Sequence, residues 1–222
     1  MRFFDILFSG LALIILSPIF LCVALILKFT GEGEIFFKQE RVGQFGKKFQ
    51  ILKFATMLRD SPNLGTGSIT SKDDPRILPF GKYLRITKIN ELPQLVNILK
   101  GDMSIIGPRP HVKRDLQGIP DDMLGCVLKL RPGLSGVGSI MFRNEEIILQ
   151  NFVEPRQFYD ELIAPYKAEL EIWYFNNKSI ILYFKLIALT IFIVIFRSNK
   201  IITTFLPTIP KPEKSLKYYL DK

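Results

Sequence analysis

The sequence predicts a mostly helical α+β protein with a membrane-associated segment near each end. Two apolar blocks, residues 6–27 and 179–196, enclose a middle region that carries most of the charged side chains. Within that region, residues 34–54 alternate apolar and polar side chains on either side of GQFG, which is typical of a small β-hairpin. Other middle segments show helical spacing, and 222 residues suffice for one main domain.

The charge balance predicts an anionic partner. Lys and Arg number 30 against 21 Asp and Glu, a formal net charge of +9. Such an excess attracts lipid headgroups, phosphorylated substrates or nucleic acid. No nucleic-acid recognition motif accompanies it, and the apolar blocks favour lipid, so we expect no nucleic-acid partner. Two cysteines and a single histidine, His111, exclude a disulfide framework and a histidine-rich metal site.

The first apolar block predicts a membrane helix with a break. Residues 6–27 contain no charge, and a straight helix of that length would reach about 33 Å. Ser17 and Pro18 lie near its middle, where proline removes a helical N–H and predicts a kink. The kinked helix either spans the membrane or turns back so that both ends stay on one side; composition alone favours spanning.

The segment after the hairpin contains a loop and two helices. Residues 60–79 are rich in Gly, Ser, Pro and Asp and predict a loop, and LGTGS within them lacks the lysine of a P-loop. Lys82, Arg85 and Lys88 recur every three residues and predict a basic helical face. Residues 92–99 have the apolar spacing of a short amphipathic helix, which Gly101 is expected to end.

The C-terminal part predicts further helices and a basic tail. Residues 121–140 include RPGLSGVG and indicate a turn-rich connection whose small residues allow close backbone approach. Residues 155–175 predict an amphipathic helix interrupted near Pro165. Residues 179–196 form the second apolar helix; because Lys185 lies inside it, lying along the interface competes with spanning. Residues 197–222 are basic and predict a partly disordered, headgroup-seeking tail.

The stretch KINELPQL has two interpretations. Asn90 is a favoured helix N-cap, and Glu91 and Pro93 suit a first helical turn, so the stretch can be explained as helix initiation. The same residues suit a phosphate site in which Glu91 holds a Mg²⁺ that bridges a diphosphate. Arg109, between two prolines in GPRP, adds a guanidinium suited to phosphate, and Asp102 is a second acid nearby in sequence.

Taken together, these blocks resemble one family. The N-terminal MRFFDILFSG, the LSP break, the hairpin sequence, KINELPQLVNILKGDMSIIGPRP and RPGLSGVG are similar to the bacterial sugar transferases, also called monotopic phosphoglycosyl transferases. The resemblance covers about residues 1–195 and rests on ordered blocks rather than on one motif.

The resemblance implies transfer of a sugar 1-phosphate from a UDP-sugar to polyprenyl (undecaprenyl) phosphate, releasing UMP with Mg²⁺ as cofactor. This reaction initiates membrane glycoconjugate and polysaccharide assembly. The resemblance also implies that Ser17 and Pro18 turn the first helix back within one leaflet. This expectation replaces the preference for a spanning helix that composition alone gave. The expected location is the bacterial inner membrane, with the catalytic domain facing the cytoplasm and downstream glycosyltransferases as further partners.

Carried onto this chain, the resemblance predicts four regions and a set of site residues. Residues 1–30 form the re-entrant helix, 31–178 the cytoplasmic catalytic domain, 179–196 an interfacial helix and 197–222 a basic tail. Asn90 and Glu91 occupy the catalytic positions, and Glu91 also binds the metal. The candidate phosphate or headgroup contacts are Arg41, Lys53, Arg85, Arg109 and Arg131. For all of these except Arg109, an ordinary exposed charge is the alternative interpretation.

One position departs from the family's pattern. The family uses an adjacent Asp and Glu, the Asp attacking the β-phosphorus to form a covalent phosphosugar intermediate; here Asn90 stands at the Asp position. An amide is a poor nucleophile, so three hypotheses follow. Asn90 orients phosphate while polyprenyl phosphate attacks directly, which we rank first; Glu91 acts as nucleophile; or the chain is a catalytically silent membrane scaffold. A smaller departure is Ala55, where the family often has arginine.

Overall fold

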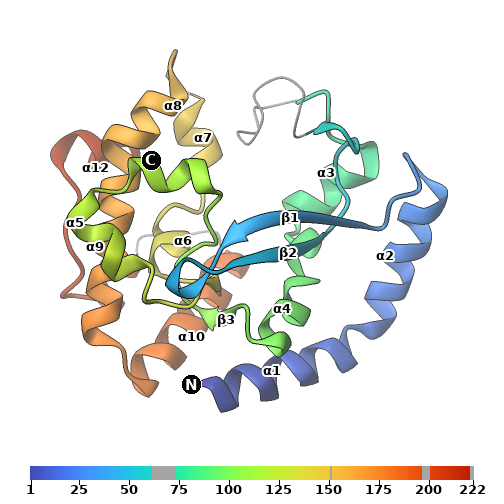
Figure 1. The fold of residues 1–222 in the computed structure, drawn as a ribbon, viewed down its shortest axis with the longest axis horizontal. Coiled ribbons are helices and arrows are strands. Elements are labelled where there is room, and N and C mark those ends of the chain that lie inside the picture. The colour runs from blue at the N-terminus through green and yellow to red at the C-terminus, as the bar shows by residue number, and fades with distance from the viewer. Residues whose placement is uncertain (62–73, 151, 197–200, 221–222) are drawn as a thin grey trace. The chain divides into compact units, whose positions relative to one another are not determined.

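Residues 1–61, 74–150, 152–196 and 201–220 are described by the structure, a computed structural model (Figure 1). They fall into two units. The N-terminal unit comprises Arg2–Glu40 and Gln50–Gly101; the C-terminal unit comprises Arg41–Phe49 and Asp102–Lys222, with Met1. Helices dominate both units, and the described strands form two-stranded sheets, which confirms the α+β class.

The predicted hairpin is confirmed. β1 (Phe36–Val42) pairs with β2 (Lys48–Phe54), and the chain reverses through a short turn at Gln44–Gly46. Phe45 and Gly46 adopt left-handed backbone conformations there, with φ of 57° and 73°. The base of the hairpin belongs to the N-terminal unit and its tip to the C-terminal unit.

The predicted kink in the first apolar block is also confirmed. The helix axis bends by 61° between α1 (Arg2–Ile15) and α2 (Ser17–Phe29), with Pro18 in the first turn of α2 (Figure 1). Within the described residues, no helix by itself has the length and apolar composition needed to cross a membrane. α1 and α2 meet those criteria only as a bent pair.

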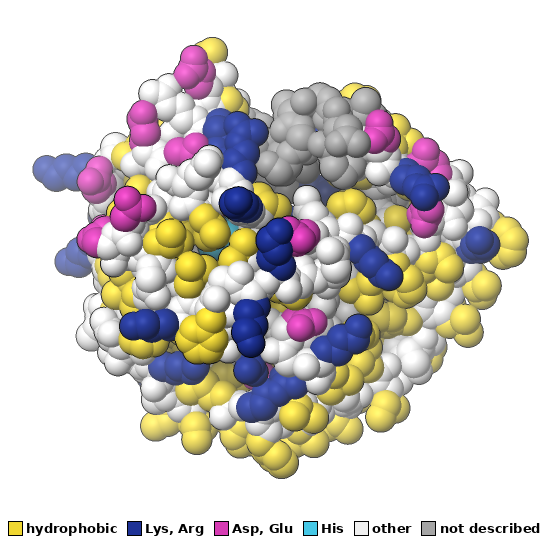
Figure 2. Space-filling view, in the orientation of Figure 1, with side chains coloured by type: hydrophobic (Ala, Val, Ile, Leu, Met, Phe, Trp, Pro, Cys, Tyr) yellow, Lys and Arg dark blue, Asp and Glu magenta, His cyan; other side chains and the backbone are white. Residues whose placement is uncertain are grey.

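α1 and α2 have an inverted distribution of polar and apolar side chains. Asp5 and Ser9 of α1 are buried. Large apolar side chains of the two helices are exposed instead: Phe3, Ile14, Ile15, Leu21 and Phe29. Figure 2 shows hydrophobic side chains, in yellow, along the edge of the molecule where α1 and α2 lie in Figure 1. α2 still contributes Val23 and Leu27 to a core that contains Phe54 and Leu84. These helices therefore leave an apolar surface without a protein partner in the described part of this unit.

The two predicted helices after the loop are present with shifted ends. α3 spans Pro79–Ile86 and α4 spans Gln94–Lys100, and Gly101, at φ 96°, ends α4 as predicted. Lys82 and Arg85 lie on α3, whereas Lys88 lies beyond it in a left-handed conformation. Most of the predicted loop, residues 62–73, lies outside the described residues.

The C-terminal unit contains a short parallel sheet that the sequence did not predict. β3 (Ser104–Ile106) pairs with β4 (Gly133–Ser135), with Ser104 opposite Gly133. The prediction of a purely turn-rich connection over residues 121–140 is therefore wrong, since it contains β4 between α5 (Asp121–Val127) and α6 (Val137–Met141). Its small residues do allow close backbone approach: a Cβ added to Gly133 would lie 2.1 Å from the Gly107 nitrogen.

Helices cover this small sheet. A 3₁₀ segment (Lys113–Gly118) precedes α5, and α7 (Glu145–Leu149) follows α6. Residues 155–177 form α8 (Pro155–Phe158), a π-helical turn (Tyr159–Ile163) and α9 (Ala164–Asn177), so the predicted interruption near Pro165 is a π-turn just before it. α5 and α9 share a core around Ile119, Val127 and Ala168. α10 (Ile180–Phe196) is the predicted second apolar helix, and its Thr190 hydroxyl lies 2.8 Å from that of Ser135.

The basic tail is more ordered than the sequence predicted. Residues 201–220 contain α11 (Ile202–Phe205) and α12 (Lys214–Leu220). Four of its apolar side chains are buried: Ile202, Leu206, Ile209 and Leu216. Tyr166 of α9 donates a hydrogen bond to the Pro210 carbonyl at 2.8 Å, and the ring of Tyr219 lies 5.1 Å from that of Phe152. The expectation of partial disorder is therefore wrong for these residues, because the tail packs on its own unit.

This packing predicts a stability effect. Leu216→Ala should lower the free energy of unfolding by roughly 2–5 kcal/mol, since it removes a buried side chain and leaves a cavity. The exposed neighbour Ser215 provides the control, and Ser215→Ala should change stability little. Thermal unfolding of both variants in detergent measures the difference, and equal midpoints would contradict the packed tail.

Candidate active site

The N-terminal unit brings together two predicted site residues that are 38 positions apart. The Lys53 ammonium lies 2.9 Å from Glu91 Oε1, with 17% and 16% of the two side chains exposed. Lys53 comes from β2, and Glu91 ends the 3₁₀ turn Ile89–Glu91. A charge-assisted pair of this kind, half-buried but open to solvent, is well placed to meet an incoming anion.

Asn97 fixes the distance between the strand and this turn. Its Oδ1 accepts from the Leu52 N–H at 3.0 Å, and its Nδ2 donates to the Gln50 carbonyl at 2.8 Å. Asn97 is 3% exposed and lies on α4, which follows the 3₁₀ turn. Both ends of this amide are therefore used to hold α4 against β2, beside Lys53.

The interpretation of Asn90 as a helix N-cap is wrong. Asn90 lies inside the 3₁₀ turn, Lys88 occupies the position before that turn, and Pro93 occupies the N-cap position of α4. Lys88 has φ 59°, a left-handed conformation that is uncommon for a residue with a side chain. This sharp turn separates α3 from the 3₁₀ segment and leaves Asn90 only 6% exposed.

The buried Asn90 side chain has an unused acceptor. Its Oδ1 atom is shielded from solvent and has no hydrogen-bond partner among the residues that the structure describes. Leaving a buried acceptor unpaired costs about 1–3 kcal/mol, and buried polar side chains are usually paired. The neighbouring Asn97, with both ends paired, shows the usual arrangement in the same unit. An orphaned polar atom at this position indicates a place for a ligand.

The other predicted cations divide between the two units. Arg85 is half-buried on α3, in the same unit as Lys53 and Glu91. Arg41, Arg109 and Arg131 belong to the C-terminal unit, as does Asp102. The predicted set therefore contains two groups, one around Glu91 and one around the GPRP segment.

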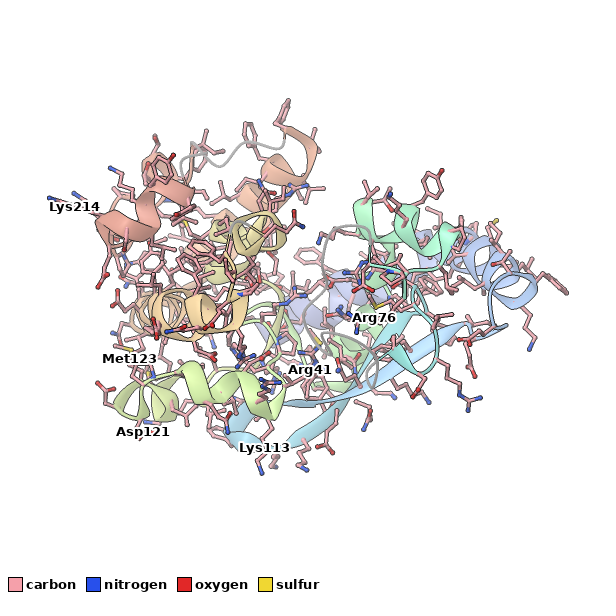
Figure 3. All side chains as sticks on the ribbon, turned by 90° about the horizontal axis from the view of Figure 1, so that it is seen from above. Arg41, Arg76, Lys113, Asp121, Met123 and Lys214 are labelled. Atoms are coloured by element: carbon pink, nitrogen blue, oxygen red, sulfur yellow. The ribbon has the colours of Figure 1, made fainter. Side chains whose placement is uncertain are left out.

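The second group is built from adjoining backbone segments. The Arg41 guanidinium, labelled in Figure 3, donates to the Pro110 carbonyl at 3.0 Å, and the Val42 N–H donates to the His111 carbonyl at 2.9 Å. The Gly133 N–H donates to the Pro108 carbonyl at 2.7 Å, which places GPRP against the RPGLSG segment. The arginines of both motifs thus come from neighbouring stretches of backbone.

Sequence reasoning missed a half-buried polar cluster beside His111. Lys167 of α9 pairs with Glu145 of α7, and its ammonium lies 5.1 Å from the ring centroids of Phe142 and Tyr159. Burial lowers the pKa of His111 to about 4, and the positive charges of Lys167, Arg41 and Arg109 act in the same direction. The Lys-to-Glu spacing of 22 residues gives no local signal, so this cluster could not be read from the sequence.

A second buried group in this unit is Glu171 of α9. It is 4% exposed, and a Cβ added to Gly138 would lie 2.9 Å from its Oε1. Burial raises the pKa of the Glu171 carboxyl to about 7, although the Gly138 N–H and the charge of Lys167 oppose this rise. Glu171 therefore keeps its proton in the folded protein over a range where an ordinary glutamic acid has lost it.

These two groups predict opposite pH dependences of stability. The raised pKa of Glu171 gives stability that is complete below pH 4.5 and is lost as pH rises through about 7. The lowered pKa of His111 gives stability that is complete above pH 6.5 and is lost as pH falls through about 4. Between pH 4.5 and 6.5 the two slopes oppose each other, so the net dependence there should be small.

Glu171→Gln should separate the two contributions. The variant should gain stability from about pH 4 to 6.5 because only the His111 slope remains, and it should no longer lose stability from pH 6.5 to 8. At pH 8 the free energy of unfolding of the variant should exceed that of the wild type by on the order of 3 kcal/mol. Thermal midpoints across this pH range measure both slopes, and parallel curves for the two proteins would contradict the assignment of Glu171.

Comparison with known proteins places the chain in a class of enzymes. The sequence model of the bacterial sugar transferases matches residues 1–197, and the chain belongs to this family. The resemblance stated from the motifs is thus confirmed, as is the expectation of a sugar-phosphate transferase enzyme. The tail beyond residue 197 lies outside the match.

Individual relatives give the comparison more detail. The chain is 40% identical over 158 residues to the exopolysaccharide production protein ExoY of Sinorhizobium fredii, a match covering 65% of this chain and 70% of that protein. It is 34% identical over 173 residues to the UDP-glucose:undecaprenyl-phosphate glucose-1-phosphate transferase of Escherichia coli, a match covering 77% of this chain and 36% of that protein. It is 37% identical over 159 residues to the undecaprenyl-phosphate galactose phosphotransferase of Salmonella typhimurium, a match covering 65% of this chain and 33% of that protein.

The relatives support the general function and leave the sugar open. Two of them are named for transfer to undecaprenyl phosphate, one with glucose and the other with galactose. The chain spans about a third of the length of those two relatives.

Proposed function

We propose that this chain transfers a sugar 1-phosphate from a UDP-sugar to a polyprenyl phosphate and releases UMP. The observation that supports this most directly is the group formed by Lys53, Asn90 and Glu91 within the part of the chain that matches the family. Lys53 offers a positive charge to the donor diphosphate, and Glu91 offers a carboxylate for a cation that accompanies it.

The residues around Glu91 fit a Mg²⁺ ion held mainly by substrate. Among the described residues, no group of three or more His, Cys, Asp or Glu could enclose a metal. Mg²⁺ often uses only one or two protein oxygens together with phosphate oxygens, and Glu91 and the orphaned Oδ1 of Asn90 supply that number. When bound, Mg²⁺ would neutralise charge on the diphosphate; positioning and charge neutralisation carry most of the catalysis of phosphoryl transfer.

The proposed route is direct transfer. An oxygen of polyprenyl phosphate bonds to the β-phosphorus of the donor, and the bond from that phosphorus to the bridging oxygen breaks. UMP leaves with the bridging oxygen. Lys53 orients the diphosphate and offsets its charge, and Asn90 takes no part as nucleophile because its amide nitrogen is a poor one. A phosphosugar adduct trapped on Glu91 would replace direct transfer by a two-step route.

The apolar surface of α1 and α2 supports a membrane role. These helices bury Asp5 and Ser9 and expose Phe3, Ile14 and Phe29, the reverse of the pattern expected against water. α10 likewise exposes Ile181 and Ile195. We propose that the bent pair enters one leaflet of the bacterial inner membrane and returns, with the catalytic residues on the cytoplasmic side, close to the lipid-borne acceptor.

Topology can be tested with cysteine labelling. A cysteine introduced near Met1 should react with a membrane-impermeant reagent only when the cytoplasmic side is accessible, because both ends of the bent pair lie on that side. The two native free cysteines, Cys22 and Cys126, are first replaced by serine. Labelling of the Met1 position from the periplasm would contradict the re-entrant arrangement.

A UDP-sugar panel tests the reaction. Detergent-solubilised protein should release UMP from at least one UDP-sugar, and release should require both polyprenyl phosphate and Mg²⁺. The alternative function, a catalytically silent scaffold that docks downstream glycosyltransferases, predicts no release from any donor. The comparisons give no support to that alternative, and the UMP assay decides between the two.

A further inference from the structure

The two buried asparagines beside the candidate site differ in one respect. Asn97 uses both ends of its amide within the N-terminal unit, by hydrogen bonds to the backbone of Leu52 and Gln50. Asn90 is almost equally buried, yet its Oδ1 has no hydrogen-bond partner among the described residues. This atom is therefore available to a bound ligand as far as the described residues go.

The chemistry of the atom restricts its partner. An amide oxygen only accepts hydrogen bonds, and an ionised phosphate oxygen has no hydrogen to donate, so phosphate itself cannot satisfy Oδ1. A hard divalent cation can, because carbonyl and carboxylate oxygens are the ligands that Mg²⁺ and Mn²⁺ prefer. Glu91, the next residue in the same 3₁₀ turn, supplies a carboxylate that already attracts a cation, the Lys53 ammonium.

We propose that Asn90 Oδ1 and the Glu91 carboxylate are the two protein ligands of a divalent cation whose remaining ligands include diphosphate oxygens. This inference rests on the proposed function, and it gives Asn90 the role of metal ligand where the family's pattern has a nucleophile. The amide suits this role because it adds an oxygen ligand without adding a second negative charge beside Glu91.

Lys53 makes cation binding conditional on the donor. Its ammonium lies 2.9 Å from Glu91 Oε1, so a metal ion approaching the free protein meets a positive charge at the carboxylate that should hold it. A bound diphosphate brings negative charge that offsets both cations. The divalent ion should therefore bind weakly to the free protein and much more tightly together with a nucleoside diphosphate.

Mn²⁺ binding to the full chain tests the proposal without measuring turnover. The electron paramagnetic resonance signal of free Mn²⁺ reports the bound fraction, with UDP as the diphosphate probe. For the wild type, UDP should raise the affinity of the protein for Mn²⁺ at least about tenfold. A control with UDP and no protein gives the Mn²⁺ bound by UDP alone, which is subtracted. Lys53→Met should strengthen Mn²⁺ binding in the absence of UDP, because it removes the positive charge that lies beside the Glu91 carboxylate.

Three asparagine variants give the decisive comparison. Asn90→Leu should weaken UDP-dependent Mn²⁺ binding at least about tenfold, the scale of loss expected when a metal site is disturbed. Asn90→Asp keeps an oxygen ligand and should retain binding. Asn97→Leu removes the two hydrogen bonds that hold α4 against β2 and should lower the thermal midpoint, whereas Asn90→Leu should leave the midpoint unchanged or raise it.

The outcomes separate this inference from the proposed function. Unchanged Mn²⁺ affinity in Asn90→Leu overturns the inference. A loss of Mn²⁺ affinity that is seen only with a UDP-sugar and not with UDP also overturns it, because that result would assign Oδ1 to a sugar hydroxyl. Wild type that releases UMP but shows no UDP-dependent Mn²⁺ site also overturns it, while the proposed function stands. A Mn²⁺ site that depends on Asn90 without UMP release from any donor leaves the inference standing and contradicts the function.

Discussion

Replacing Glu91 by glutamine is expected to reduce UMP release by at least about 100-fold. The Glu91 carboxylate accepts a hydrogen bond from the Lys53 ammonium at 2.9 Å. It is also the negatively charged ligand proposed for the cation that accompanies the donor. Glutamine keeps the size of the side chain but removes the charge, so it weakens both interactions together. Because both act on the transferring phosphoryl group, the loss should appear mainly in kcat/KM.

Glu169 provides a matched control for this variant. It is an exposed glutamate on α9 in the C-terminal unit, and Glu169→Gln should leave UMP release within about twofold of the wild type. Wild-type turnover in Glu91→Gln would contradict both the metal role and the nucleophile role of Glu91. A loss in Glu91→Gln with unchanged Mn²⁺ binding would favour the nucleophile.

The second large effect concerns stability, at a buried ion pair in the N-terminal unit. Arg76, labelled in Figure 3, donates to the two Asp74 carboxylate oxygens at 2.6 and 2.9 Å and to the Ser61 carbonyl at 2.8 Å. Arg76 and Asp74 are both buried. Arg76→Met removes the guanidinium from the buried Asp74 charge, and should reduce the free energy of unfolding by about 3–5 kcal/mol.

An exposed ion pair in the same unit gives the comparison. Arg59 lies 3.6 Å from Glu34, and both side chains are open to solvent. Arg59→Met should change the free energy of unfolding by at most about 1 kcal/mol, the usual value of an exposed pair. Urea unfolding in detergent, followed by circular dichroism, measures both variants, and similar midpoints would refute a structural role for the buried pair.

Local signals predicted the parts of the fold that depend on neighbouring residues. The alternation around GQFG predicted the hairpin, Pro18 predicted the bend between α1 and α2, and Gly101 predicted the end of α4. The parallel pairing of β3 with β4 was missed because it joins residues about 30 positions apart, and RPGLSGVG reads locally as a turn. The order of the tail was missed for the same reason, since it depends on contacts with distant residues, such as the hydrogen bond from Tyr166 to the Pro210 carbonyl.

The site was predicted as a set of residue types without its internal geometry. Lys53 and Glu91 were both selected from the sequence, but only the fold shows that they form an ion pair. Asn90 looked equally suitable as a helix cap, and the left-handed Lys88 excludes that by placing Asn90 inside a 3₁₀ turn. The cluster of Lys167, Glu145 and His111 had no signal in the sequence, because each residue alone is an ordinary polar side chain.

The most direct measurement follows the β-phosphate of the donor. With the UDP-sugar that supports UMP release, labelled with ³²P at the β-phosphate, and polyprenyl phosphate as acceptor, transfer of a sugar 1-phosphate moves the label into the lipid fraction and leaves unlabelled UMP in the aqueous phase. We expect this result, with the transfer lost in Glu91→Gln. Label retained in the aqueous phase as UDP, with the sugar alone on the lipid, would contradict the account.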